Sequence, residues 1–120
     1  MSHVVTITTK VKDIQAIRAA CLRLNLAEPV HGVTKLFTTD VTGWVVQLPN
    51  WHFPIVINTE TGDIQFDNYN GRWGKQEYLD RFMQAYAVEM TRQQARRKHY
   101  SVTEQTLKDG SIRLQILEGR

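Results

Sequence analysis

The chain has few of the residues that fix a fold covalently or anchor it in a membrane. It has 120 residues and one cysteine, Cys21, so no internal disulfide is possible. No apolar run approaches the ~20 residues that a membrane-spanning helix needs. The N-terminal MSHVVTITTKVKD lacks the basic and apolar regions of a secretion signal. We therefore expect a cytoplasmic protein whose fold depends on its hydrophobic core.

The sequence also lacks the motifs of common catalytic and cofactor sites. No two histidines have the i, i+4 spacing of a helical metal site, and His3 is expected to be a partly buried residue in register with Val5 and Ile7. No Gly-x-Ser-x-Gly elbow, P-loop or dinucleotide fingerprint is present. The sequence thus predicts no catalytic residue, no metal and no cofactor.

The composition that remains is that of a globular protein with an uneven charge. Hydrophobic residues make up 42% and charged residues 22%, which predicts a single domain over residues 1–120. Residues 1–80 hold seven Lys/Arg and eight Asp/Glu, whereas residues 81–120 hold eight and four. The basic last third is compatible with an acidic partner such as nucleic acid, although such asymmetry is common without one.

Hydrophobic periodicity predicts seven strands and two helices. The expected order is a strand (3–11), a helix (12–25) capped by Asp13, four strands (34–40, 43–48, 53–58, 64–69), a long helix within 71–100, and a hairpin (99–107, 111–117). Thr61-Gly62-Asp63 and Lys108-Asp109-Gly110 are expected turns. Short turns favour antiparallel pairing, and each helix has one apolar stripe. We predict a two-layer α+β fold, with a sheet of about six to seven strands and both helices on one face.

Several motifs together resemble a known family. They are the Met-Ser-His start before a strand and a Lys-Asp-led helix, and a tail in which basic residues and an aromatic precede Val-x-Glu and then Asp-Gly-Ser-Ile-x-Leu. The second helix adds a Leu-x-x-Phe-x-Gln-x-Tyr-Ala core, formed by Leu79, Phe82, Gln84, Tyr86 and Ala87. In this order they resemble the hypothetical chloroplast reading frame thirty-five family (domain of unknown function twelve fifty-seven).

This resemblance implies a soluble cytoplasmic or stromal protein and no particular activity. Relatives in that family are often encoded near AAA-type ATPases, which implies an accessory or adaptor role. We therefore expect a non-enzymatic binding domain that acts through a protein partner.

A basic stripe on the long helix supports an alternative function. With 3.6 residues per turn, Arg81, Arg92 and Arg96 fall on one side of the helix, and Lys98 follows them. If this stripe binds phosphates, the protein is a nucleic-acid-binding module. Arg96, Arg97 and Lys98 also suit a helix C-terminus without any ligand.

A group of aromatic and basic residues supports a second alternative, a small-ligand or enzyme site. Trp51 and His52 precede one strand, and Trp73 precedes the long helix beside Arg72 and Lys75. The two cations flank Gly74 and could hold an anion, although a plain glycine helix cap is the simpler interpretation. Tryptophans at such boundaries also commonly seal a core.

The remaining candidates have structural interpretations. Cys21 lies on the apolar stripe of the first helix, so we expect a core residue. Asp63 and Asp67 flank a turn and are expected to be solvated. A homo-oligomer is also possible, since antiparallel sheets of this size often leave a free edge.

Overall fold

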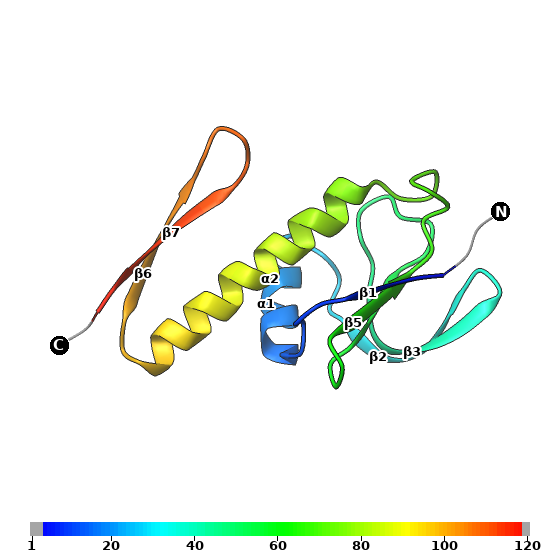
Figure 1. Ribbon diagram of the computed structural model, residues 1–120, viewed down its shortest axis with the longest axis horizontal. Helices are drawn as coiled ribbons and strands as arrows, with labels where there is room; N and C mark the ends of the chain where they lie inside the picture. Colours follow the sequence, from blue (N-terminus) through cyan, green and yellow to red (C-terminus); the bar gives the residue numbers. More distant parts are fainter. Residues whose placement is uncertain (1–3, 119–120) are drawn as a thin grey trace.

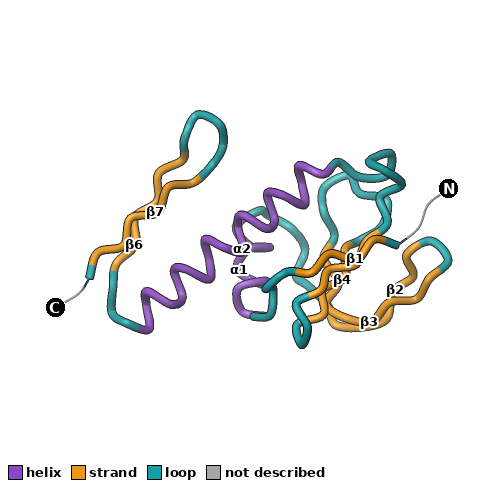
Figure 2. The backbone as a smooth tube through the Cα atoms, in the orientation of Figure 1, coloured by secondary structure: helices purple, strands orange, loops and turns teal. Residues whose placement is uncertain are grey.

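The computed structural model describes residues 4–118 and has the α+β class and element order predicted from the sequence (Figures 1 and 2). The elements are β1 (Val5–Thr8), α1 (Ile14–Arg23), β2 (Val30–Leu36), β3 (Thr39–Val46), β4 (Ile55–Asn58), β5 (Asp63–Phe66), α2 (Gln76–Arg97), β6 (Ser101–Thr106) and β7 (Ile112–Leu117). All strand pairs are antiparallel. The prediction of one sheet of six to seven strands is wrong in this respect: the seven strands form two sheets, a five-stranded one in the order β1-β5-β4-β3-β2 and the separate hairpin β6–β7, which packs on α2.

Helix α1 begins where the sequence predicts. The Asp13 carboxylate accepts hydrogen bonds from the amides of Gln15 and Ala16, at 2.8 and 3.1 Å. The hydroxyl of Tyr86, on α2, accepts from the amides of Lys12 and Asp13. The start of α1 is thereby attached to the middle of α2 as well as capped.

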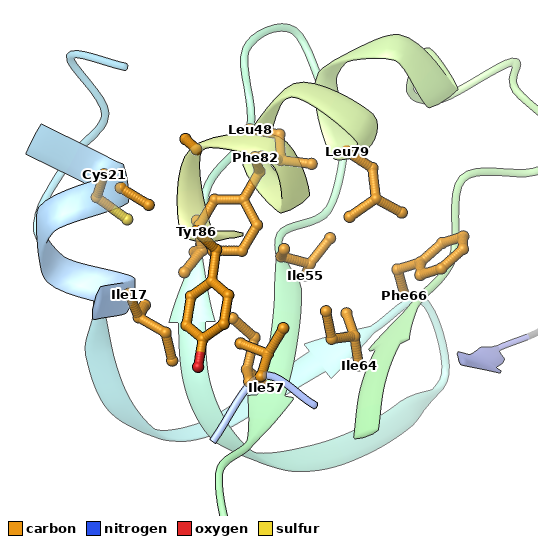
Figure 3. Close-up of a cluster of buried hydrophobic side chains, with 14 of the residues drawn as sticks. Ile17, Cys21, Leu48, Ile55, Ile57, Ile64, Phe66, Leu79, Phe82 and Tyr86 are labelled. Carbon is orange, nitrogen blue, oxygen red and sulfur yellow. The ribbon is translucent and has the colours of Figure 1, made fainter. Parts of the chain in front are cut away.

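Both helices pack on one face of the five-stranded sheet, as predicted. Figure 3 shows α1 and α2 directing apolar side chains onto those of the central strands. The contributors it labels are Ile17 and Cys21 from α1, Leu79, Phe82 and Tyr86 from α2, Ile55 and Ile57 from β4, Ile64 and Phe66 from β5, and Leu48. Burial of these side chains is the main source of stability.

The opposite face of the sheet has a smaller core at its centre. Val56 is buried there with Leu36 and Val41, which lie close to the turn between β2 and β3. The β2–β3 hairpin therefore curves back across this face. The predicted strand 34–40 is wrong, because this segment contains the turn, in which Phe37 has φ 60°. A phenylalanine rarely takes this conformation, so the sequence carried no turn signal.

The β6–β7 hairpin packs on the side of α2 that faces away from the five-stranded sheet (Figure 1). Gln84 donates to the carbonyl of Gly110 and Arg92 donates to Glu104, so the hairpin covers this side of the helix. Val88 and Ala95, on the same side, are only 4% exposed. Helix α2 thus has two buried faces, and it separates the hairpin from the larger sheet. No helix within residues 4–118 is long and apolar enough to cross a membrane.

Candidate functional site

The candidate site is a group of five aromatic rings, Trp73 and four rings that contact it, which we call the aromatic cluster. The distances from the Trp73 ring centroid are 4.8 Å to Tyr69, 5.2 Å to His52, and 5.6 Å to each of Phe37 and Phe53. His52 and Phe53 also meet edge to face at 4.6 Å. Such tilted and edge-on contacts are favourable for aromatic pairs, and they hold the rings in fixed relative positions.

Three loops far apart in the sequence bring these rings together. Phe37 comes from the β2–β3 turn, His52 and Phe53 precede β4, and Tyr69 and Trp73 lie between β5 and α2. These loops lie at the end of the molecule opposite the β6–β7 hairpin (Figures 1 and 2). Phe37 is 49% exposed and His52 is exposed, so the cluster forms part of the surface.

Hydrogen bonds hold the loop that carries Tyr69 and Trp73. The carbonyl of Asn68 accepts from the amides of Gly71 and Trp73, at 3.0 and 2.8 Å. The Asn68 side-chain amide donates to the carbonyl of Gly74, and Asn68 is 8% exposed. The amide of His52 donates to the carbonyl of Trp73 at 2.7 Å, which joins this loop to the segment before β4. The backbone that carries the rings is therefore held in place by hydrogen bonds.

Asp67 contradicts the expectation that it is solvated. It is 2% exposed, and its carboxylate accepts from the amide of Tyr69 at 3.2 Å. An aspartate that bonds the backbone two residues on stabilises a turn, which explains its position before the left-handed residues Tyr69 and Asn70. Asp63, at the start of β5, is partly exposed, and the pair forms no catalytic arrangement.

Trp51 lies beneath the surface and supports the loop from inside. It is 4% exposed, and its indole nitrogen donates to the carbonyl of Lys75 at 3.0 Å. Gly74 packs against it so closely that an added Cβ would lie 2.6 Å from Trp51 Cγ. The expected glycine cap is therefore wrong. Lys75 is the N-cap, without a side-chain bond, and Gly74 is required by the contact with the indole.

Of the predicted aromatic and basic group, the structure brings His52, Trp73 and Arg72 to one surface. The Arg72 guanidinium lies 5.1 Å from the Tyr69 ring centroid and places a cation at the edge of the aromatic cluster. Phe37 and Phe53 were missed by sequence reasoning. Phe37 was expected inside a strand, and only the curvature of the β2–β3 hairpin brings it to Trp73.

The predicted basic stripe does not form a continuous free surface. Arg81 lies 3.6 Å from Glu77 and stacks on Tyr78, in a depression that Asp80 and Asp109 also line. Arg92 is on the face covered by the hairpin. Arg81 is exposed but lies beside Glu77, whereas Arg96 and Lys98, with Arg97 between them, are exposed at the C-terminal end of α2.

Arg92 belongs to an ionic cluster that joins α1, α2 and β6. Arg23 binds both carboxylate oxygens of Glu104, at 2.8 and 2.9 Å, and also bonds Glu89 at 3.0 Å. Arg92 donates to Glu104 at 2.7 Å. The hydrogen bonds from Arg23 are the main reason that the pKa of Glu104 lies below its ordinary value. Two arginines and two glutamates give this cluster no net charge, so it offers little to a polyanion.

The other candidate residues form no site in the described part of the chain. Cys21 is buried, as expected, and desolvation raises the pKa of its thiol to about 11. Within residues 4–118, no group of three or more His, Cys, Asp and Glu side chains could hold a metal ion. His3 lies outside the described residues.

Comparison with known proteins adds no assignment. No protein-family model, curated protein or solved structure matches this chain. The resemblance to the chloroplast reading frame family therefore stays a prediction that rests on the motifs in the sequence.

Proposed function

We propose that the protein is a non-enzymatic binding domain that engages a protein partner through the aromatic cluster. The observation that carries the proposal is the set of rings around Trp73, with Phe37 and Arg72 exposed at its edge. Tryptophan, tyrosine and arginine are the residues that most often dominate the binding energy of protein interfaces. An exposed group of such residues suits the centre of an interface.

The ordered loop beneath the rings supports the same proposal. Binding costs less free energy when the contact residues already hold their bound positions. The bonds made by Asn68, the contact of Gly74 with Trp51 and the bond from His52 to Trp73 fix this loop on the sheet side of the fold. The rings can therefore bind with little ordering of their own backbone.

The family resemblance suggests which kind of protein the partner is. It implies a role beside an AAA-type ATPase, and we propose such an ATPase as the first partner to examine. This suggestion comes from the gene neighbourhoods of that family. The aromatic cluster supports a protein partner in general.

A nucleic-acid partner has less support from the contacts on α2. The stripe that suggested it is interrupted, because Arg92 is bound to Glu104 and Arg81 lies beside Glu77. Arg96, Arg97 and Lys98 remain exposed, but three neighbouring cations suit a helix C-terminus equally well. A polyanion would need a longer row of free charges.

The proposal can be tested by affinity purification from the native host. A variant carrying Phe37→Asn and Arg72→Glu removes an exposed ring and reverses the adjacent charge. Asparagine tolerates the positive φ at position 37, so the turn is retained. The matched control, Leu22→Gln with Arg96→Glu, makes the same kind of changes on another surface, since Leu22 is 79% exposed.

We expect the wild type and the control to recover the same partner. The Phe37/Arg72 variant should recover about tenfold less, because a loss of about 1.4 kcal/mol of binding free energy weakens binding tenfold. Equal recovery by that variant, with an unchanged melting temperature, would contradict the proposal. Recovery of nucleic acid or of a small ligand, in place of a protein, would contradict it as well.

A further inference from the structure

The β6–β7 hairpin is a two-stranded sheet with free edges. No other strand in the described part of the chain pairs with either of its strands, and no residue of the hairpin belongs to the two hydrophobic core clusters. A two-stranded hairpin is marginally stable alone, and three or more strands are normally needed. Contacts with α2 offset part of this deficit, but the outer edge of β7 is unpaired.

The groups on that edge follow from the hydrogen-bond pattern of the hairpin. The amide of Leu107 donates to the carbonyl of Ser111, which closes the ladder at the turn. In an antiparallel ladder, alternate residues then direct N–H and C=O away from the partner strand. In β7 these residues are Ile112, Leu114 and Ile116. All three are apolar, and Ile116 is 48% exposed.

This edge has few of the features that usually keep strands apart. Natural edge strands are commonly protected by lysine, by proline or by a bulge. β7 contains neither lysine nor proline, its one charged residue is Arg113, and its pairing with β6 runs without a bulge from Ile112 to Leu117. The edge is therefore competent to accept a further strand.

We propose that this strand is β7 of a second copy of the chain. A two-fold axis normal to the sheet at Leu114 would pair Leu114 with Leu114 of the second copy, and Ile112 with Ile116 of the second copy. In this register the outward N–H and C=O groups of both strands face each other. Arg113 would lie opposite Gln115, so no like charges would meet. β7 is thus complementary to its own copy, the relation that two-fold dimers require.

The orientation of the hairpin on α2 agrees with this arrangement. Glu104 points towards α2, where it binds Arg92, and its cross-strand partner Leu114 lies on the same face of the hairpin. A two-fold axis normal to the sheet keeps both faces the same in the two copies. The result is a four-stranded antiparallel sheet with one α2 helix from each copy on one side, the layered packing common in α+β proteins.

Light scattering coupled to gel filtration tests this proposal over a range of protein concentrations. We expect the wild type to reach twice the 13.9 kDa mass of one chain. Ile116→Pro removes an outward N–H without touching the β6 ladder, and should give a monomer. Ile116→Thr keeps that N–H and a β-branched side chain, and should still form the dimer. A monomeric wild type at every concentration, or a dimeric Ile116→Pro variant, would overturn the proposal.

Amide hydrogen exchange of the wild type provides a second test that does not depend on a variant folding. In the proposed dimer, the amides of Ile112, Leu114 and Ile116 are paired and should exchange as slowly as those of Arg113 and Gln115. The protection of the three outward amides should fall when the protein is diluted to monomer. Rapid exchange of these amides in a dimeric sample would mean that the contact lies elsewhere, and would overturn the proposal.

Discussion

At the residue scale, the loop under the aromatic cluster depends on the contact between Gly74 and Trp51. Gly74→Ala would place a Cβ 2.6 Å from Trp51 Cγ and Cε2, so the buried Trp51 ring or the backbone before α2 would have to shift. We expect this substitution to lower the free energy of unfolding by about 1–3 kcal/mol, as overpacking does. Gly32→Ala is the control, since nothing lies within 4 Å of the added Cβ. Urea unfolding measures both, and equal stability would contradict this account of Gly74.

The buried thiol of Cys21 should make both stability and alkylation depend on pH. Burial raises the pKa of its thiol from 9.0 to about 11, so the folded protein favours the protonated form. This contribution to stability is present below pH 9 and is lost as the pH rises from 9 to about 11. We also expect alkylation at pH 8 to be about a hundredfold slower in the folded than in the unfolded protein.

Iodoacetamide labelling with and without urea measures these rates. Cys21→Ala should remove the alkaline loss of stability that the thiol causes. Equal labelling rates in the two states would mean that the thiol is accessible in the folded protein.

Phe37 and Asp67 show why part of the candidate site could not be read from single residues. Phe37 occupies a left-handed turn position that its sequence context, Thr-Lys-Leu-Phe-Thr-Thr, gave no reason to expect. Asp67 is buried because it bonds the amide of Tyr69, a contact that depends on the path of the whole loop. In contrast, Asp13, Gly62 and Gly110 were predictable, since capping and turn chemistry act within a few residues.

At the element scale, α2 carries more than one apolar stripe. Its main stripe, which includes Leu79, Phe82 and Tyr86, was predictable from helical spacing and lies in the core. Its second buried face has only Val88 and Ala95 as fully buried residues, so the sequence pattern there is weak. The hairpin covers this face, which explains why the seven predicted strands form two sheets.

Two arginines of the basic stripe lie on different faces of α2, so the same substitution should affect stability by different amounts. Arg92→Glu would set a carboxylate against Glu104, so we expect it to lower stability by about 1–2 kcal/mol, between the values for exposed and buried ion pairs. It should also speed amide exchange in β6 and β7. Arg96→Glu makes the same charge change on an exposed residue and should alter stability by less than about 0.5 kcal/mol.

Urea unfolding and hydrogen exchange measure this pair of variants. If Arg92→Glu were as stable as Arg96→Glu, the ionic cluster would not hold the hairpin on α2. The alternative function, in which Arg92 contacts a phosphate, would then gain support.

At the scale of the whole molecule, the two proposed contacts lie at opposite ends. The molecule measures 55 × 32 × 23 Å. Figure 1 shows α2 running between the loops that carry the aromatic cluster, at one end, and the β6–β7 hairpin at the other. A dimer formed through β7 would therefore leave both aromatic clusters accessible. Two clusters on one dimer would strengthen binding to a partner that is itself multivalent.

The fold class was predictable at this scale, whereas the site was predictable only in part. Alternating apolar and polar residues, apolar stripes at helical spacing and glycine turns are local patterns. They predicted the order of the elements and the packing of both helices on one face of the sheet. The aromatic cluster depends on how three loops meet in space. Residue types alone indicated His52, Arg72 and Trp73 as members of the site. They could not show that Trp51 is buried below it, or that Phe37 and Phe53 belong to it.

The central claim is that a protein partner contacts the aromatic cluster, and site-specific photo-crosslinking in the native host tests it most directly. A photoreactive phenylalanine analogue at Tyr69 keeps an aromatic ring in the cluster, and the same analogue at Tyr100, beyond the far end of α2, serves as the control. We predict a covalent adduct with another protein from position 69 and none with that protein from position 100. No protein adduct from position 69, or the same adduct from both positions, would contradict the claim.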